Sequence, residues 1–307
     1  MLVRCPSQID DQGLGMTGLR RTWTVAAPAV FVLLWSTGFI GARLGLPHAE
    51  PFIFLTFRFS ILAVLLCAVG LVWRAPWPTS WTQAGHLAVV GLLMHGFYLG
   101  SVFWAISNGV SAAVAALIVG IQPLLTAVAA GPYLGEKVSA RQWIGLVLGF
   151  AGVALVVGDD LFLHSGSEVG VIACIVALCG ITLGTLYQKR HGGNMDLRTG
   201  SAIQFAAAAV AMLILTLVFE EGRVVWTGEF VFALSWLVVV LSIGAMSLLY
   251  LLIRQGAATK VASLFYLVPP VVAIEAYFLF GDTMTLFDIT GMIVAMSAVA
   301  LVLRGGK

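Results

Sequence analysis

The chain has 307 residues, of which 60% are hydrophobic and only 10% carry a charge. Soluble domains contain roughly 45–50% apolar and about 25% charged residues, so this composition and a mean hydropathy of +1.03 exclude a soluble protein. The formal net charge of +2 says nothing about partners by itself. We therefore expect a protein that crosses the lipid bilayer many times, with a small-molecule substrate and no nucleic-acid partner.

The chain begins with a polar, glycine-rich segment, residues 1–22, which ends in Arg20-Arg21. We predict a cytoplasmic tail. The apolar run that follows is too long for a secretory signal and lacks a small-residue cleavage site.

Apolar runs long enough to cross about 30 Å of hydrocarbon as helices recur along the rest of the chain. They predict an all-α membrane protein of ten transmembrane helices, at residues 25–44, 51–73, 86–106, 110–133, 141–157, 169–187, 197–219, 233–253, 257–280 and 286–303.

Lysine and arginine are distributed unequally between the two sets of connecting segments. The segments and helix ends on the side of the N-terminus hold every Lys and Arg of the chain except Arg43 and Arg223, which lie on the other side, and Arg58, which lies deep in a span. By the positive-inside rule, we expect both termini to lie in the cytoplasm.

The sequence of one half returns in the other. Leu134-Gly135-Glu136 and Gly145 return as Phe280-Gly281-Asp282 and Gly291, a constant shift of 146 residues (136 to 282 and 145 to 291). A period of half the chain predicts two five-helix repeats, residues 23–158 and 169–304. Five is an odd number, so the second repeat enters the membrane from the opposite side, as in secondary transporters.

Motifs of catalysis are absent from the sequence. It contains no GxSxG, no HExxH, no Walker A loop and no His or Cys spacing for a metal. We predict that the protein is not an enzyme and needs no cofactor and no metal. We also expect a monomer.

Three ionisable residues lie deep in apolar spans. Arg58 and Glu275 each lie about seven residues from the predicted outer end of their spans, so we predict that they form a charge pair. The alternatives are a substrate-binding or a gating group. His95 could shuttle protons, or it could be a neutral residue that bonds a neighbouring carbonyl.

Prolines interrupt two corresponding spans near their middle, at Pro123 and at Pro269-Pro270. Proline removes a backbone donor and clashes with the preceding turn, so both helices should break there. Matched breaks at the midplane indicate a transporter's binding site. The predicted substrate site comprises Trp35, His95, Tyr98, Gln122, Pro123, Tyr266, Pro269 and Pro270. The alternative is that the prolines only curve the helices.

Glycines at short spacing favour close helix packing. Gly145-x3-Gly149 with Gly152, and Gly180-x3-Gly184, each place small residues on one helix face.

The repeated pattern Gly135-Glu136, Gln142-x2-Gly145 and Gly152-Val153, together with Leu34-Trp35-Ser36, resembles the EamA repeat of the drug/metabolite transporter superfamily. The second half departs from it, with Asp282 in place of the Glu. Within that superfamily the chain looks most similar to bacterial aromatic amino-acid exporters of the YddG type. The resemblance implies export of amino acids, aromatic or neutral, and similar small metabolites across a bacterial inner membrane by alternating access. The alternatives are a multidrug exporter of amphipathic or cationic compounds and a membrane sensor or assembly subunit that transports nothing.

Overall fold

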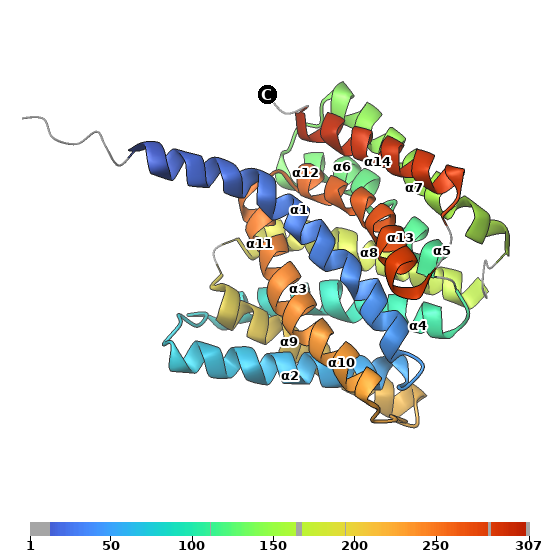
Figure 1. Cartoon of the computed structure of the whole chain (residues 1–307). Helices are drawn as coiled ribbons and strands as arrows, with labels where there is room; N and C mark the ends of the chain where they lie inside the picture. The colour runs from blue at the N-terminus through green and yellow to red at the C-terminus, as the bar shows by residue number, and fades with distance from the viewer. Residues whose placement is uncertain (1–12, 111, 164–167, 194, 282–283, 305–307) are drawn as a thin grey trace, which may run out of the picture.

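The computed structural model shows a bundle of helices (Figure 1). The structure describes residues 13–110, 112–163, 168–193, 195–281 and 284–304, without the side chains of 13–25, 112–114, 117 and 156–163. Most of the predicted tail lies outside the described residues, and so does Asp282. Within the described residues the only β-structure is an isolated bridge between Ala49 and Val224.

The helices of the first half are separated by short loops. They are α1 (Gly13–Gly45), α2 (Pro51–Val72), α3 (Trp81–Gly91), the π-helix η1 (Leu92–Gly100), α4 (Ser101–Ser107), α5 (Ala112–Val119), α6 (Gln122–Leu134) and α7 (Ala140–Leu163).

The second half has the same succession of elements. They are α8 (Glu168–His191), α9 (Leu197–Phe219), α10 (Gly228–Trp236), the π-helix η2 (Leu237–Ala245), α11 (Met246–Gln255), α12 (Ala258–Ser263), the 3-10 turn η3 (Leu264–Leu267), α13 (Val268–Phe280) and α14 (Leu286–Arg304).

Eight helical segments of the described chain are long and apolar enough to span a membrane, and residues 140–155 form a shorter apolar helix. The protein is therefore a multi-pass, all-helical membrane protein. The predicted fourth span is divided into α5 and α6, neither of which is long enough alone. The count of ten crossings stays a prediction.

Both helix interruptions lie where the prolines predict them. Pro123 lies in the first turn of α6, immediately after the turn at 120–121 that ends α5. Pro269 and Pro270 lie in the first turn of α13, after the 3-10 turn η3. A proline in the first turn of a helix loses no intrahelical bond, so each proline starts a new helix.

Helices that correspond in the two halves pack against each other in antiparallel fashion. Along α2 and α9, Thr56 lies 3.4 Å from Thr216, whereas Gly70, near the other end of α2, faces Thr199. The α7–α14 pair runs the same way, because Gly145 faces Val302 and Gly152 faces Gly291. The two helices of each pair start 146 residues apart, which is the period of the sequence repeat. Helix α2 starts at residue 51 and α9 at 197, and α7 starts at 140 and α14 at 286.

Glycine permits this closeness, as the spacing predicted. A Cβ on Gly145 would lie 2.9 Å from the carbonyl oxygen of Ala298, and one on Gly152 would lie 2.7 Å from the Ala295 nitrogen. Gly180 does the same on α8, where a Cβ would lie 2.9 Å from the Tyr98 nitrogen. The packing interpretation of these glycines is confirmed.

Candidate functional site

A small cavity lies within the bundle, among helices α1, α2, η1–α4 and η2–α11. Its lining residues are Trp35, Gly38, Phe39, Ala42, Arg58, Tyr98, Leu99, Val102, Phe103, Ile106, Leu241 and Met246. About 30 Å³ of it is open to the centre of a water molecule, which is room for one or two waters. An amino acid does not fit without opening of the helices.

One helix face of α1 supplies the first wall of the cavity. Trp35, Gly38, Phe39 and Ala42 follow the i, i+3, i+4, i+7 spacing of a helix stripe. The Trp35 ring is held by two aromatic neighbours, with centroids 5.3 Å from both Phe31 and Phe265. The indole is therefore a rigid part of the wall.

The two π-helical segments supply the opposite walls. Tyr98 and Leu99 lie in η1, and Leu241 lies in η2, with the cavity between them. These segments start 145 residues apart, at Leu92 and Leu237, so the two halves deviate from α-helical geometry at corresponding places. Deviations of this kind often occur at functional sites.

Among the described residues that line the cavity, only Arg58 is an Asp, Glu, Lys, Arg or His. Its side chain is 1% exposed. Its Nε and Nη2 both donate to the Ser242 hydroxyl, at 3.1 and 2.8 Å, and that hydroxyl donates to the Leu237 carbonyl at 2.9 Å. Within the described residues, Nη1 has no hydrogen-bond partner.

The predicted pair of Arg58 with Glu275 is not formed. Glu275 is half-buried on α13, and its Oε2 has no hydrogen-bond partner among the described residues. Helix α2 packs along α9, whereas α13 packs along α1 (Figure 1). Equal depth in the membrane does not bring two residues together when their helices occupy different sides of the bundle.

His95 belongs to a second buried network and is not among the residues that line the cavity. Its Nε2 lies 3.3 Å from the Tyr250 oxygen, whose hydroxyl donates to Gln204 Oε1. Gln204 in turn donates from Nε2 to Gln188 Oε1 at 3.2 Å. Because Tyr250 uses its proton on Gln204, its oxygen accepts from His95, which fixes the proton of His95 on Nε2. These groups connect α8, α9, α11 and η1.

The two helix interruptions are buried but do not line this cavity. Gln122 donates from Nε2 to Thr126 at 3.1 Å, and Pro123, Pro269 and Pro270 are buried. The Tyr266 ring lies against Gly149, where a Cβ would come within 2.4 Å of it. Its neighbour Phe265 packs on Trp35 instead. Of the predicted substrate residues, the cavity therefore brings together only Trp35 and Tyr98, with Arg58.

The sequence pattern alone did not identify Phe39 or the apolar side chains of α4 as cavity residues, nor Ser242 as the partner of Arg58. The stripe that starts at Trp35 is a helical period that could have identified Phe39 and Ala42. No local signal marks Ser242, because its role depends on the packing of η2 against α2.

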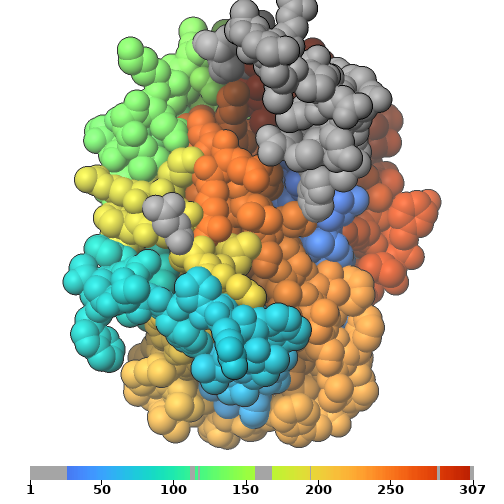
Figure 2. Space-filling view, turned by 90° about the vertical axis from the view of Figure 1, so that its left-hand side faces the viewer, coloured from blue at the N-terminus to red at the C-terminus, as the bar shows by residue number. Residues whose placement is uncertain are grey.

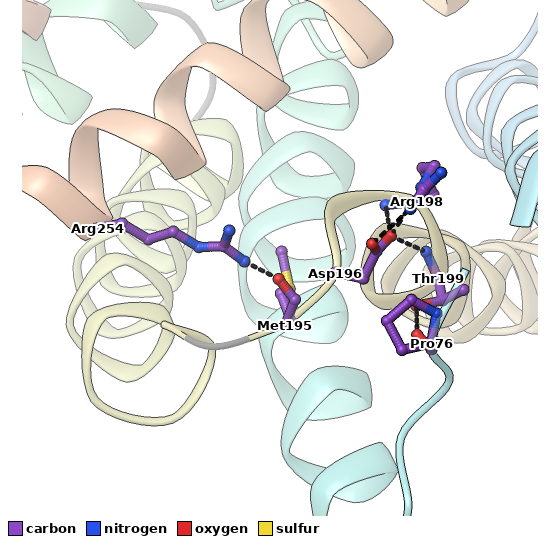
Figure 3. Close-up of polar contacts among 6 residues, drawn as sticks. All are labelled: Pro76, Met195, Asp196, Arg198, Thr199 and Arg254. Atoms are coloured by element: carbon purple, nitrogen blue, oxygen red, sulfur yellow. Dashed lines mark hydrogen bonds and ion pairs between the residues drawn. The ribbon is translucent and has the colours of Figure 1, made fainter. Parts of the chain in front are cut away.

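Polar contacts join the helix ends on the predicted inner side. Lys189 donates to the Ile253 carbonyl at 2.7 Å, and Glu136 Oε1 accepts from the Ala258 nitrogen at 2.9 Å. Arg254 donates to the Met195 carbonyl (Figure 3). Figure 2 shows this face, with the ends of α8 in yellow and α11–α12 in orange across its middle. Cavity residues Ala42 and Ile106 lie near the opposite ends of α1 and α4.

At the rim of the same side, Asp196 caps the N-terminus of α9. It accepts from the nitrogens of Arg198 and Thr199, at 2.9 and 3.4 Å, and Thr199 donates to the Pro76 carbonyl at 2.7 Å (Figure 3). The Arg198 guanidinium beside it lowers the pKa of the Asp196 carboxyl to about 2. Across the described residues, no group of three or more His, Cys, Asp or Glu could hold a metal ion.

The relatives that cover most of this chain include two that are named as transporters. "Uncharacterized transporter YvbV" of Bacillus subtilis (strain 168) is 27% identical over 292 residues, 94% of this chain and 93% of that protein. "Uncharacterized inner membrane transporter YedA" of Escherichia coli (strain K12) is 26% identical over 281 residues, 90% of each chain. "WAT1-related protein At3g02690, chloroplastic" of Arabidopsis thaliana is 23% identical and covers 94% of this chain and 70% of that protein.

A solved crystal structure has the same fold. It superposes with a TM-score of 0.75 at 19% sequence identity and covers 94% of this chain and 99% of that chain. The model of the EamA-like transporter family matches twice, over residues 22–158 and 168–304. Members of this family are transporters and not enzymes. With a match in each half, this chain belongs to the EamA-like transporter family.

Proposed function

We propose that this protein exports amino acids, aromatic or neutral, and similar small metabolites across a bacterial inner membrane by alternating access. The observation that carries the proposal is the cavity between η1 and η2, with the aromatic side chains of Trp35, Phe39, Tyr98 and Phe103 in its wall. Aromatic and aliphatic walls with few polar groups suit small, partly apolar ligands. The likeness of the repeat to aromatic amino-acid exporters favours the same substrate class.

The mechanism requires two five-helix repeats of opposite orientation, ten crossings and both termini in the cytoplasm. The antiparallel packing of α2 on α9 and of α7 on α14 supports this inverted arrangement. The charge distribution supports the cytoplasmic termini.

In this conformation, the contacts of Lys189, Glu136 and Arg254 tie the predicted inner ends of the helices together. The cavity extends toward the opposite ends. We assign the structure to a state closed on the inner side. Transport then requires these contacts to break when the inner ends separate.

The cavity lies inside the helix bundle of the chain, among α1, α2, η1–α4 and η2–α11. We therefore propose that the transporter acts as a monomer.

The rival function is a multidrug exporter of amphipathic or cationic compounds. In that reading Glu275 would bind the cation. Glu275 is not among the residues that line the cavity, whereas Arg58 is, and its positive charge opposes a cationic ligand.

The test is counterflow of labelled phenylalanine in proteoliposomes that contain the purified protein, in parallel with a cationic dye. We expect phenylalanine to accumulate and the dye not to. Phe39→Ala should reduce uptake, while Phe278→Ala, at a phenylalanine that is 78% exposed on α13, should not. Uptake of the dye alone would favour the rival, and uptake of neither by folded protein would disprove both.

A further inference from the structure

The buried guanidinium of Arg58 has more hydrogen-bond donors than its surroundings can satisfy. An arginine carries five N–H donors in a planar fork. Ser242 Oγ, a single neutral oxygen, accepts from Nε and Nη2, and Nη1 has no hydrogen-bond partner in the described part of the chain. A buried charge with one uncharged partner is costly in a membrane and, in natural proteins, commonly marks a functional site.

Among the described residues of the cavity wall, no other side chain balances this charge. The other eleven lining residues are glycine, alanine, apolar or aromatic side chains, including the Tyr98 phenol. The carboxylate at comparable depth, Glu275, lies on α13 and forms no ion pair with Arg58. The wall therefore presents one positive charge beside a large apolar and aromatic surface.

Ser242 leaves one edge of the guanidinium available. It occupies the edge formed by Nε and Nη2, so the end formed by Nη1 and the second hydrogen of Nη2 remains for a ligand. Two parallel N–H donors at that end match the two oxygens of a carboxylate. The attraction is strong because the site is buried away from water.

We propose that Arg58 is the carboxylate-binding residue of this transporter, and that its substrates are apolar or aromatic monocarboxylates, including neutral amino acids. Ser242 is a positioning residue, since it holds the guanidinium from η2. The described residues of the cavity wall include no acid to bind an ammonium group, so the carboxylate and not the amine selects the ligand. This inference rests on the proposed function, because it takes the cavity to be the transport site.

The first experiment uses the wild-type protein and needs no variant. Unlabelled compounds compete with labelled phenylalanine in proteoliposome counterflow. We expect 3-phenylpropionate, which keeps the carboxylate and lacks the amine, to compete as well as phenylalanine. Phenylalaninamide and phenethylamine, which lack the carboxylate, should compete at least about tenfold less well, as expected for loss of a charge-assisted bond.

The second experiment tests the two residues. Arg58→Gln should raise the KM for 3-phenylpropionate about 10- to 100-fold, the range for a lost hydrogen bond to a charged group. Arg223→Gln is the matched control, because Arg223 is an exposed loop arginine beside Glu221. Ser242→Ala should raise KM with little change in maximal rate, and Ser242→Thr, which keeps the hydroxyl, should restore it.

Each outcome decides between specific claims. Equal competition by the amide or amine, or an unchanged KM in Arg58→Gln, would overturn the assignment of Arg58 while the transport function stands. Absence of counterflow by wild-type protein with every one of these solutes would remove the proposed function, and this inference with it.

Discussion

Two groups of buried polar side chains lie in this bundle, and they differ in how their hydrogen bonds are satisfied. In the network of His95, Tyr250, Gln204 and Gln188, the polar side chains bond to one another and do not line the cavity, although His95 Nδ1 has no partner among the described residues. Arg58 lines the cavity, and a single serine holds it. Burial alone therefore does not separate structural from functional polar residues. The separating features are the number of side-chain partners and access to a cavity.

The largest effect on stability is expected from Gln204→Leu. The change leaves the Tyr250 hydroxyl and Gln188 Oε1 without their partners. Each buried group without a partner costs about 1–3 kcal/mol, so we expect a loss of about 2–6 kcal/mol. Thermal unfolding in detergent would measure it, with Gln255→Leu, at an exposed glutamine of α11, as the control. Equal stability of the two variants would show that the network is not structural.

Tyr250→Phe removes only the hydroxyl of the same network. Gln204 Oε1 then loses its donor and His95 Nε2 its acceptor, although the ring stays in place. We expect a loss of about 1–3 kcal/mol and an unchanged KM for phenylalanine. Tyr277→Phe, at a tyrosine that is 45% exposed, should leave both unchanged. A raised KM without loss of stability would show that Tyr250 acts in substrate binding and not in the structural network.

A smaller effect is expected at the rim, where Asp196 and Arg198 are in contact with solvent. The pKa of the Asp196 carboxyl, about 2, is below its ordinary value of 3.8, chiefly because of the bond from Arg198. The stabilisation is therefore present above about pH 4 and lost as the pH falls from 4 to 2. Asp196→Asn keeps a helix cap, so its loss at pH 7 should be smaller than that of Tyr250→Phe. Identical acid-unfolding curves for the wild-type protein and Asp196→Asn would contradict this linkage.

The smallest effect on stability is expected from Arg58→Gln. The change removes two bonds to Ser242, but it also removes the cost of a buried charge, so the net change should be below about 1 kcal/mol. Thermal unfolding of this variant beside Gln204→Leu tests the comparison directly. A loss of stability as large as that of Gln204→Leu would show that Arg58 has a structural role.

Several features of the fold were predictable because they depend on local chemistry. Proline removes a backbone donor wherever it occurs, so Pro123 and Pro269 placed both helix interruptions before any packing was known. Glycine spacing likewise predicted a helix face of α7 that a neighbour approaches closely, and the structure shows that this neighbour is α14. The composition of the cavity wall was only partly predictable. Trp35 was notable because it lies in mid-span, but Ser242 is a serine like others in the chain.

By itself the sequence determined the class of protein, the apolar segments, the duplication and the residues at which the helices break. Hydropathy and proline chemistry are properties of neighbouring residues, and a duplication is visible in the residue order itself, so all three can be read without coordinates. Only the tertiary structure decided which deep polar groups meet. It placed Arg58 against Ser242 rather than Glu275, and Tyr266 against Gly149 rather than in the cavity. The physical reason is that sequence position fixes the depth of a residue along its helix. Its neighbours also depend on the rotation of each helix and on which helices adjoin, and these are decided by packing.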